Sequence, residues 1–320
     1  MSAAPTLPDG LTLSADKAAL YPQDTYFLDA WDQLGRLTGD PAGFAARHAL
    51  LLLKPDAVAA HALEPSIDWL GEQGFTIVAL RQLTLTRLTV RALWYFQWNI
   101  ASPERQRVGD ALIAAADALL LVVTADPAER LPASVLLTER KGPTDPDERE
   151  PGQLRHRLGG ETYLLNMVHT PDEPADVVRE LGVYAGASER ARIYREALAG
   201  IDRSDVARAA AQHLTASGSP RSTALEPAAR ALCADVAAAL GTLPGPERAA
   251  AEAALADAAA DARAAAPLLR LAWELDLPLD PWAAAVTGAH LLPMKRPGTA
   301  TLPAVPAATW TEHLAATEAP

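Results

Sequence analysis

Two short, largely apolar runs constrain the fold most strongly, because each ends abruptly in a residue that can bind phosphate. The first run, 49–53, contains only Ala and Leu and stops at Lys54-Pro55-Asp56, and the second, 163–168, stops at His169. Four to eight apolar residues bounded by turn residues are typical of a buried strand. Each strand is therefore predicted to end in a loop that opens a helix, with a cation or an imidazole at the sheet edge.

Strands and helices alternate around these runs. Further strands are predicted over 75–86 and 119–124, and helices over 57–72, 88–99 and from 172 to 180. β-Branched residues support the second strand, and Gly74 is placed to end the helix before it. This order of elements is typical of a split βαβ, ferredoxin-like α+β domain, although periodicity alone does not single out that fold.

The chain divides into three predicted parts. Residues 1–46 form an N-terminal extension that is poorly ordered at its start and has one helix over 26–35 and a turn over 39–43. Residues 47–185 form the alternating domain. Residues 186–320 form an Ala-rich helical domain with a Pro-rich tail over 295–306. Its helices are predicted over 189–198, 204–214, 225–240, 246–266, 268–275 and 309–315, with a linker over 217–222.

Charge and composition exclude several classes of protein. The chain has 28 Lys and Arg against 40 Asp and Glu, a net charge of −12, which is the wrong sign for general nucleic-acid binding. No apolar run reaches the ~18 residues that a membrane-spanning helix needs. Cys233 is the only cysteine, and the start of the chain lacks the pattern of a secretion signal, so a cytoplasmic protein is expected. Any anionic ligand would have to be bound by a local cluster of cations.

Four segments, taken in order, resemble the nucleoside diphosphate kinase family. They are the strand that ends in Lys54-Pro-Asp, the strand-like 73–80, the loop 142–146 with 151–155, and the Asn166-x-x-His169 spacing. The resemblance covers residues 47 to about 184, and Glu180 falls where the family has a helix glutamate. It implies a ferredoxin-like fold and a kinase that moves the terminal phosphoryl group of ATP or another NTP through a phosphohistidine. It also implies Mg²⁺ that is carried by the nucleotide rather than by protein ligands.

The resemblance implies a role for each matching residue. His169 would be the nucleophile, since a neutral imidazole can accept a phosphoryl group on a ring nitrogen. Glu180 would accept a hydrogen bond from the other ring nitrogen, and Lys54 would bind the transferring phosphate as a compact positive charge. Arg155 and Thr144 would bind the nucleotide phosphates, and Asn166 would bind the sugar hydroxyl or polarise the phosphate region.

The sequence departs from the family pattern at phosphate-binding positions. Thr138 stands where the family has an arginine, so the nearby Arg140 and Lys141 are the candidates to replace it. Trp94 stands at the position of a family tyrosine, with Tyr95 one residue further on, and Thr-Pro-Asp replaces Gly-Ser-Asp after the histidine. A divergent member is therefore predicted, with its nucleophile intact and with Arg140, Trp94 and Tyr95 as further nucleotide-binding candidates.

Three functions stay open from the sequence. The first is the phosphotransferase, acting on a normal or modified nucleotide. The second is a nucleotide-binding pseudo-kinase or scaffold whose helical domain docks a protein partner, and the third is nucleotidyl transfer in the same pocket. Homo-oligomerisation is open as well, because the added helices are able to block or replace the contacts that family members use.

The same residues also have plain structural interpretations. Taken alone, His169 is typical of a histidine at a strand end whose ring nitrogens are hydrogen-bonded within the fold. Taken alone, Glu180 is typical of a glutamate on the surface of a helix. The aromatic cluster 94–98 is typical of a helix face in the core, with base stacking as the alternative.

Overall fold

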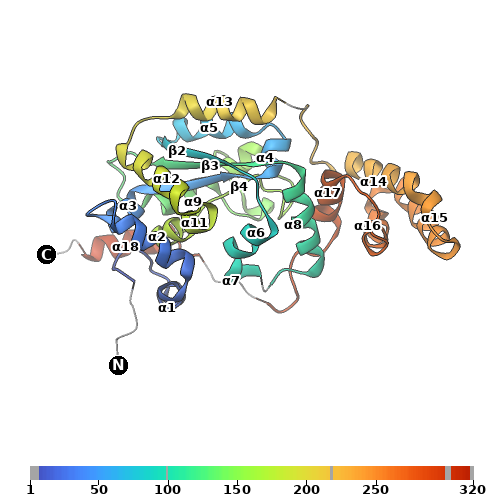
Figure 1. Cartoon of the computed structure of the whole chain (residues 1–320), viewed down its shortest axis with the longest axis horizontal. Coiled ribbons are helices and arrows are strands. Elements are labelled where there is room, and N and C mark those ends of the chain that lie inside the picture. Colours follow the sequence, from blue (N-terminus) through green and yellow to red (C-terminus); the bar gives the residue numbers. More distant parts are fainter. Residues whose placement is uncertain (1–6, 99, 217–218, 300–303, 318–320) are drawn as a thin grey trace.

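A four-stranded antiparallel sheet forms the centre of the protein (Figure 1), as a computed structural model shows for residues 7–98, 100–216, 219–299 and 304–317. The strands are β1 (His48–Leu53), β2 (Thr76–Leu83), β3 (Ala118–Thr124) and β4 (Val168–His169), in the spatial order β2-β3-β1-β4. With its crossover helices this is the predicted ferredoxin-like α+β fold, which is therefore confirmed. β1 and β3 are almost entirely apolar, as expected for the two central strands of a sheet that is buried on both faces.

Helices cover both faces of the sheet, and this explains why β1 is apolar at every position from Ala49 to Leu53. Leu50 and Leu52 point into one core cluster, whereas Ala49, Leu51 and Leu53 point into another on the opposite face. Successive side chains of a strand alternate between the two faces. Because both faces are buried, each face needs its own set of apolar residues.

The N-terminal extension packs on the first face, against α11 (Pro174–Tyr184) and α12 (Ala187–Ala199). It contains α1 (Ala15–Leu20), the 3₁₀ turn Tyr21–Gln23, α2 (Thr25–Gly35) and α3 (Pro41–Arg47). The predicted helix 26–35 is confirmed by α2. The turn predicted over 39–43 was wrong, because the Asp40 carboxylate accepts a hydrogen bond from the Gly43 N–H (2.8 Å) and starts α3.

Buried ion pairs hold the beginning of the extension in place. The Lys17 ammonium lies 2.9 Å from the Glu173 carboxylate and 2.6 Å from that of Asp176, both at the start of α11. Residues 7–20 are thus ordered on the domain, contrary to the expectation of a poorly ordered start. Residues 1–6 of that prediction lie outside the described residues.

The second face is covered by α4 (Pro55–Ala59), α5 (Leu63–Glu72), α9 (Ala133–Lys141), α10 (Leu154–Leu158) and α13 (Ser204–Thr215). The single helix predicted over 57–72 is two helices, because His61 adopts a left-handed backbone conformation (φ 57°) between them. The helix predicted over 88–99 is also divided, into α6 (Arg87–Leu93) and α7 (Tyr95–Trp98), with Trp94 between them. Residue 99 and the Trp98 side chain lie outside the described residues.

The fourth strand is shorter than predicted. Only Val168 and His169 pair with β1, opposite Leu53 and Leu52. Residues 163–167 form a loop instead, in which Met167 has a positive φ of 66° and its N–H donates to the buried Asp56 carboxylate (2.8 Å). The strand prediction for 163–167 was therefore wrong, because a side chain far away in the sequence takes the hydrogen bond that a ladder would have used.

The C-terminal helices form a separate layer with its own core at one end of the molecule (Figure 1). They are α14 (Leu225–Ala239), α15 (Gly245–Ala260), α16 (Ala265–Glu274) and α17 (Pro281–Leu291), joined by 3₁₀ turns at Leu240–Thr242 and Ala262–Ala264. The layer docks on α8 (Pro103–Ala115), a helix that the sequence patterns did not predict, and α17 was not predicted either. α18 (Ala307–Thr317) returns to the opposite end of the molecule.

Most predicted C-terminal helices are confirmed, although the one over 246–266 ends at Ala260. α12 and α13 pack on the two faces of the sheet through Ile193 and Ala207. The boundary between residues 185 and 186 stays a prediction. Parts of the predicted linker (217–218) and tail (300–303) lie outside the described residues. Within the described residues, no helix is both long and apolar enough to cross a membrane.

The contact between α2 and α11 depends on a glycine. A Cβ atom added to Gly182 of α11 would lie 2.3 Å from the Tyr26 carbonyl oxygen, a backbone atom that cannot move alone. We expect Gly182→Ala to lower the free energy of unfolding by about 1–3 kcal/mol, as overpacking does. The matched control is Gly71→Ala in α5, where a Cβ meets nothing within 4 Å and the substitution should be neutral or stabilising. Urea unfolding of both variants checks this, and an unchanged midpoint for Gly182→Ala would contradict the close approach.

Candidate functional site

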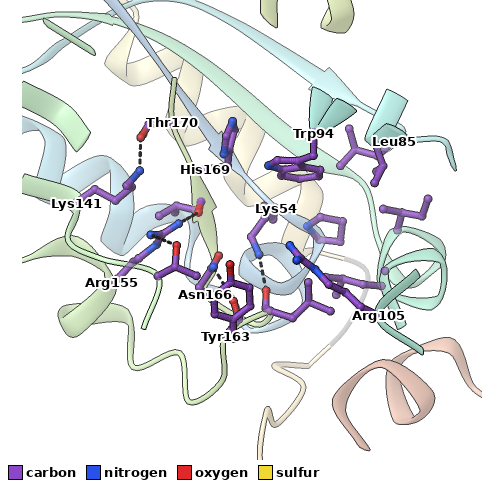
Figure 2. Close-up of a pocket in the computed structure, with 18 of the residues that line it drawn as sticks. Lys54, Leu85, Trp94, Arg105, Lys141, Arg155, Tyr163, Asn166, His169 and Thr170 are labelled. Carbon is purple, nitrogen blue, oxygen red and sulfur yellow. Dashed lines mark hydrogen bonds between the residues drawn. The ribbon is translucent and has the colours of Figure 1, made fainter. Parts of the chain in front are cut away.

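A cavity of about 170 Å³ opens where β1 and β4 end (Figure 2). Because Leu52 pairs with His169, and the Lys54 N–H donates to the Met167 carbonyl oxygen (2.9 Å), Lys54 and His169 lie on the same face of this strand pair. Both side chains line the cavity. The other polar residues that line it are Arg105, Lys141, Thr144, Arg155, Tyr163, Asn166, Thr170 and Asp172, together with the indole of Trp94.

His169 is oriented by a carboxylate. Its Nε2 atom lies 2.9 Å from Oε1 of Glu180, which α11 carries. An ionised carboxylate accepts from the N–H form of this nitrogen, so the lone pair of the imidazole is on Nδ1. The Trp94 ring meets the imidazole edge-on at 5.3 Å between centroids, and 19% of the His169 side chain stays exposed. The ring is thus held firmly but remains within reach of a ligand.

Lys54 is held at the inner end of the cavity by two oxygen atoms. Its ammonium donates to the Leu164 carbonyl oxygen (2.8 Å) and lies 3.3 Å from the Asp56 carboxylate. Burial lowers the pKa of Lys54, and the charge of Asp56 opposes that change. Asp56 is fully buried as the second residue of α4, next to the helix N-terminus, where a negative charge is favoured.

Arg155 connects the loop around Thr144 with β4. Its guanidinium donates to the Gly142 carbonyl oxygen (3.1 Å), the Thr144 hydroxyl (3.1 Å) and the Val168 carbonyl oxygen (2.8 Å). Burial, followed by repulsion from Arg149, lowers the pKa of Arg155 to about 10. The residue therefore keeps its charge at neutral pH. Both Arg155 and Thr144 line the cavity, and their predicted contacts with nucleotide phosphates stay a prediction.

Lys141 lies close to His169 on the last turn of α9. Its buried ammonium donates to the Thr170 hydroxyl, which also lies 2.9 Å from the Thr138 hydroxyl. Burial, followed by repulsion from Arg155, lowers the pKa of Lys141 to about 7, although Asp172 and Glu180 act in the opposite direction. Of the two cations considered as replacements for an arginine at position 138, Lys141 is the one that reaches the cavity.

The structure places two sequence candidates outside the cavity. Arg140 binds the Glu129 carboxylate (2.6 Å) and the Gln73 carbonyl oxygen (2.7 Å) on the outer side of α9. Tyr95 is 66% exposed and does not line the cavity, whereas Trp94 does. The placement of Arg140 follows from helical geometry, because adjacent residues of a helix such as Arg140 and Lys141 point about 100° apart. Asn166 lines the cavity and donates to the Tyr163 carbonyl oxygen (3.0 Å).

Sequence reasoning missed Arg105 and Tyr163. The Arg105 guanidinium lies 5.3 Å from the centroid of the Tyr163 ring, and both line the cavity. A signal for α8 was present, because Ser102-Pro103-Glu104 combines a helix-capping serine with a proline in the first turn. The Ser102 hydroxyl indeed accepts the Arg105 N–H (2.9 Å). Without α8 in the prediction, there was no reason to bring Arg105 to the site.

The charge of the cavity is opposite to that of the chain. Four cationic side chains line it, from Lys54, Arg105, Lys141 and Arg155, and Asp172 is the one carboxylate among its described lining residues. The chain as a whole carries −12. Such a local excess of buried cations favours a ligand with several negative charges.

Among the described residues, no group of three or more His, Cys, Asp or Glu side chains is arranged to hold a metal ion.

The fold and this basic cavity define a domain of the nucleotide phosphotransferase kind. Residues 47–189 match the family model described as "Nucleoside diphosphate kinase". A relative with that name from Sorangium cellulosum is 28% identical over 145 residues, which cover 45% of this chain and 94% of the relative. Another, from Thermococcus kodakarensis, is 25% identical over 137 residues, which cover 42% of this chain and 74% of the relative. A solved nucleoside diphosphate kinase from Aquifex aeolicus aligns at 24% identity with a TM-score of 0.37, over 44% of this chain and 96% of that one.

Residues 47–189 are therefore a domain of the nucleoside diphosphate kinase family. The chain carries this domain between the N-terminal extension and a large helical C-terminal region.

Anion binding should be linked to the protonation of Lys141. A phosphate beside its ammonium favours the charged form, which raises the pKa of Lys141 above its value of about 7 in the unliganded protein. We therefore expect ADP binding at pH 8 to take up a proton, and ADP affinity to fall as the pH rises from 7 to 9. Titration calorimetry in two buffers with different ionisation enthalpies measures the uptake. Lys141→Met should abolish the uptake and Arg140→Met should keep it, whereas uptake that survives in Lys141→Met would assign the proton to another group.

Proposed function

We propose that the protein is a nucleoside diphosphate kinase-like enzyme that moves the terminal phosphoryl group of a nucleoside triphosphate through His169 to a nucleotide acceptor. The observation that carries the proposal is the hydrogen bond between Nε2 of His169 and Glu180 (2.9 Å) in a cavity lined by buried cations. This bond assigns the free lone pair to Nδ1, as a nucleophilic imidazole requires.

Transfer would proceed in two half-reactions. The Nδ1 lone pair attacks the γ-phosphorus, an N–P bond forms, the bond between phosphorus and the β-phosphate oxygen breaks, and the nucleoside diphosphate leaves. A second nucleoside diphosphate then attacks the same phosphorus with its terminal oxygen, and the N–P bond breaks. Nε2 keeps its proton throughout, and Glu180 stabilises the positive charge that develops on the ring.

The surrounding side chains supply position and charge rather than covalent chemistry. Lys54, Lys141 and Arg155 would neutralise the phosphate oxygens, on which the transition-state charge is distributed. Thr144 offers a hydroxyl to the phosphates, and Asn166 offers its amide to the sugar or the phosphates. Mg²⁺ would arrive with the nucleotide and neutralise part of the phosphate charge, and Asp172 is the carboxylate among the described lining residues that could help to hold it.

One observation favours a nucleotide-binding pseudo-kinase as the second candidate. The donors of Arg155, Lys54 and Asn166 already bind protein oxygen atoms, so nucleotide must displace some of these bonds or bind between them. A protein whose cations serve mainly to hold the loops together would bind nucleotide and not transfer phosphate. Measurements of covalent labelling separate the two candidates.

Incubation with γ-labelled ATP and Mg²⁺ should label the wild-type protein on His169. The adduct should be labile in acid and stable in base, and ADP should remove it. His169→Gln should lose the label, while His156→Gln, on the exposed side of α10, should keep it. If the wild type binds ADP and takes up no label, the protein is a binding module. Label from α-labelled ATP instead would indicate nucleotidyl transfer.

Loss of the Glu180 carboxylate should slow phosphoryl transfer to His169 and leave ADP binding nearly unchanged. Glu180→Ala removes the group that accepts from Nε2, so the ring loses its orientation and its preferred tautomer. We expect the rate of His169 phosphorylation at saturating ATP to fall by about 10- to 100-fold. The dissociation constant for ADP should remain within a factor of about two, because Glu180 lies behind the ring. Glu139→Ala, an exposed glutamate of α9, is the control. A Glu180→Ala variant that labels at the normal rate would rule out this role.

A further inference from the structure

A residue from the C-terminal region contacts the cavity wall formed by Arg105 and Tyr163. The ammonium of Lys295 lies 4.7 Å from the centroid of the Tyr163 ring, and the Arg105 guanidinium lies 5.3 Å from the same centroid. Arg105 and Tyr163 line the cavity, whereas Lys295 is exposed. Two cations therefore meet one aromatic ring at the edge of the site. In Figure 2, Arg105 lies on the opposite side of Lys54 from Arg155 and Lys141.

Specific backbone contacts hold the segment that carries Lys295 in place. Lys295 forms an antiparallel bridge with Ala101, and the Arg296 N–H donates to the Ile100 carbonyl oxygen (2.7 Å). The Arg296 side chain also donates to the Ala101 carbonyl oxygen (2.9 Å). The Ser102 hydroxyl, which caps α8, donates to the Pro293 carbonyl oxygen. The position of Lys295 is thus tied to the beginning of the helix that carries Arg105.

The C-terminal helices also pack against the two segments that carry Arg105 and Tyr163. α17 lies against α8 in Figure 1, and a Cβ atom on Gly288 would lie 2.4 Å from Cγ2 of Val108, so the two helices approach closely. Val108 of α8 and Leu165, two residues after Tyr163, belong to the core cluster of the C-terminal helices. This wall of the cavity is therefore built on the added region and not on the sheet.

The charges of this wall indicate its ligand. Each cation is attracted to the face of the tyrosine ring, but the two cations repel each other. A bound anion offsets that repulsion, because it is attracted by both cations. A nucleoside diphosphate or triphosphate fits this chemistry, because its phosphates carry several negative charges.

We propose that Lys295 is a positioning residue that, through Tyr163 and Arg105, raises the affinity of the pocket for nucleoside polyphosphates. The inference rests on the proposed function only for the identity of the ligand. It gives the C-terminal helical region a role in nucleotide binding: the region supports one wall of the pocket and places a cation against the tyrosine ring of that wall. Lys295 takes no part in the transfer step, because His169 and its oriented carboxylate lie elsewhere in the cavity.

Charge-removing and charge-keeping variants test this role. Lys295→Gln should weaken ADP binding by about three- to tenfold in calorimetric titrations, as expected for a partly exposed charge. The loss should appear in affinity and not in the rate of His169 labelling at saturating ATP. Lys295→Arg should keep most of the affinity for ADP, because a guanidinium also binds the face of an aromatic ring. Arg263→Gln removes an exposed cation from the same helical region and should bind ADP normally.

A double-mutant cycle shows whether Lys295 acts through the tyrosine ring. The effects of Lys295→Gln and Tyr163→Leu on ADP affinity should be less than additive, because both remove the same contact between the ammonium and the ring. Normal ADP binding by Lys295→Gln, failure of Lys295→Arg to keep most of the affinity, or full additivity would overturn the proposal. Absence of His169 label from a wild type that binds ADP would refute the transfer reaction alone, since the binding comparison remains valid. Absence of ADP binding by the wild type would refute both.

Discussion

The structure depends on one buried carboxylate, that of Asp56. It accepts the Met167 N–H (2.8 Å) and lies 3.3 Å from the Lys54 ammonium, and it is 0% exposed. Such partners offset the cost of burying the carboxylate, and the nearby N-terminus of α4 also favours its negative charge. These contacts fasten the end of β1 to the loop before β4. As a result, Lys54 and His169 face the same cavity, although 115 positions separate them in numbering (169 minus 54).

The site combines charges that would repel one another in the absence of a ligand. Lys54, Lys141 and Arg155 are all buried, and the pKa of each is lowered by that burial. The protein offsets this cost with backbone carbonyl oxygens, with hydroxyls such as that of Thr170, and with Asp56. A polyphosphate would replace part of these interactions with stronger ones between opposite charges. Function and local stability therefore oppose each other here, as they commonly do at binding sites.

Much of the domain and of its site could be predicted from the sequence. The uninterrupted apolar runs define β1 and β3, and Lys54, Thr144, Arg155, Asn166 and His169 do line one cavity. Predictions failed where the outcome depended on distant contacts. Residues 163–167 form a loop because Asp56 takes the Met167 N–H, and the helix over 57–72 breaks at His61. α8 and α17 were missed although their docking forms a wall of the site.

The sequence by itself determined which residue types are available and the order in which strands present them, because buried strands and their terminal polar residues are local patterns. Only the tertiary structure decided that Lys141 and not Arg140 enters the cavity, since helix register depends on what each face packs against. It also decided that the C-terminal helices belong to the pocket. Contacts such as Lys295 with Tyr163 join residues that are far apart in the chain, and the free energy of such packing has no local signature in the sequence.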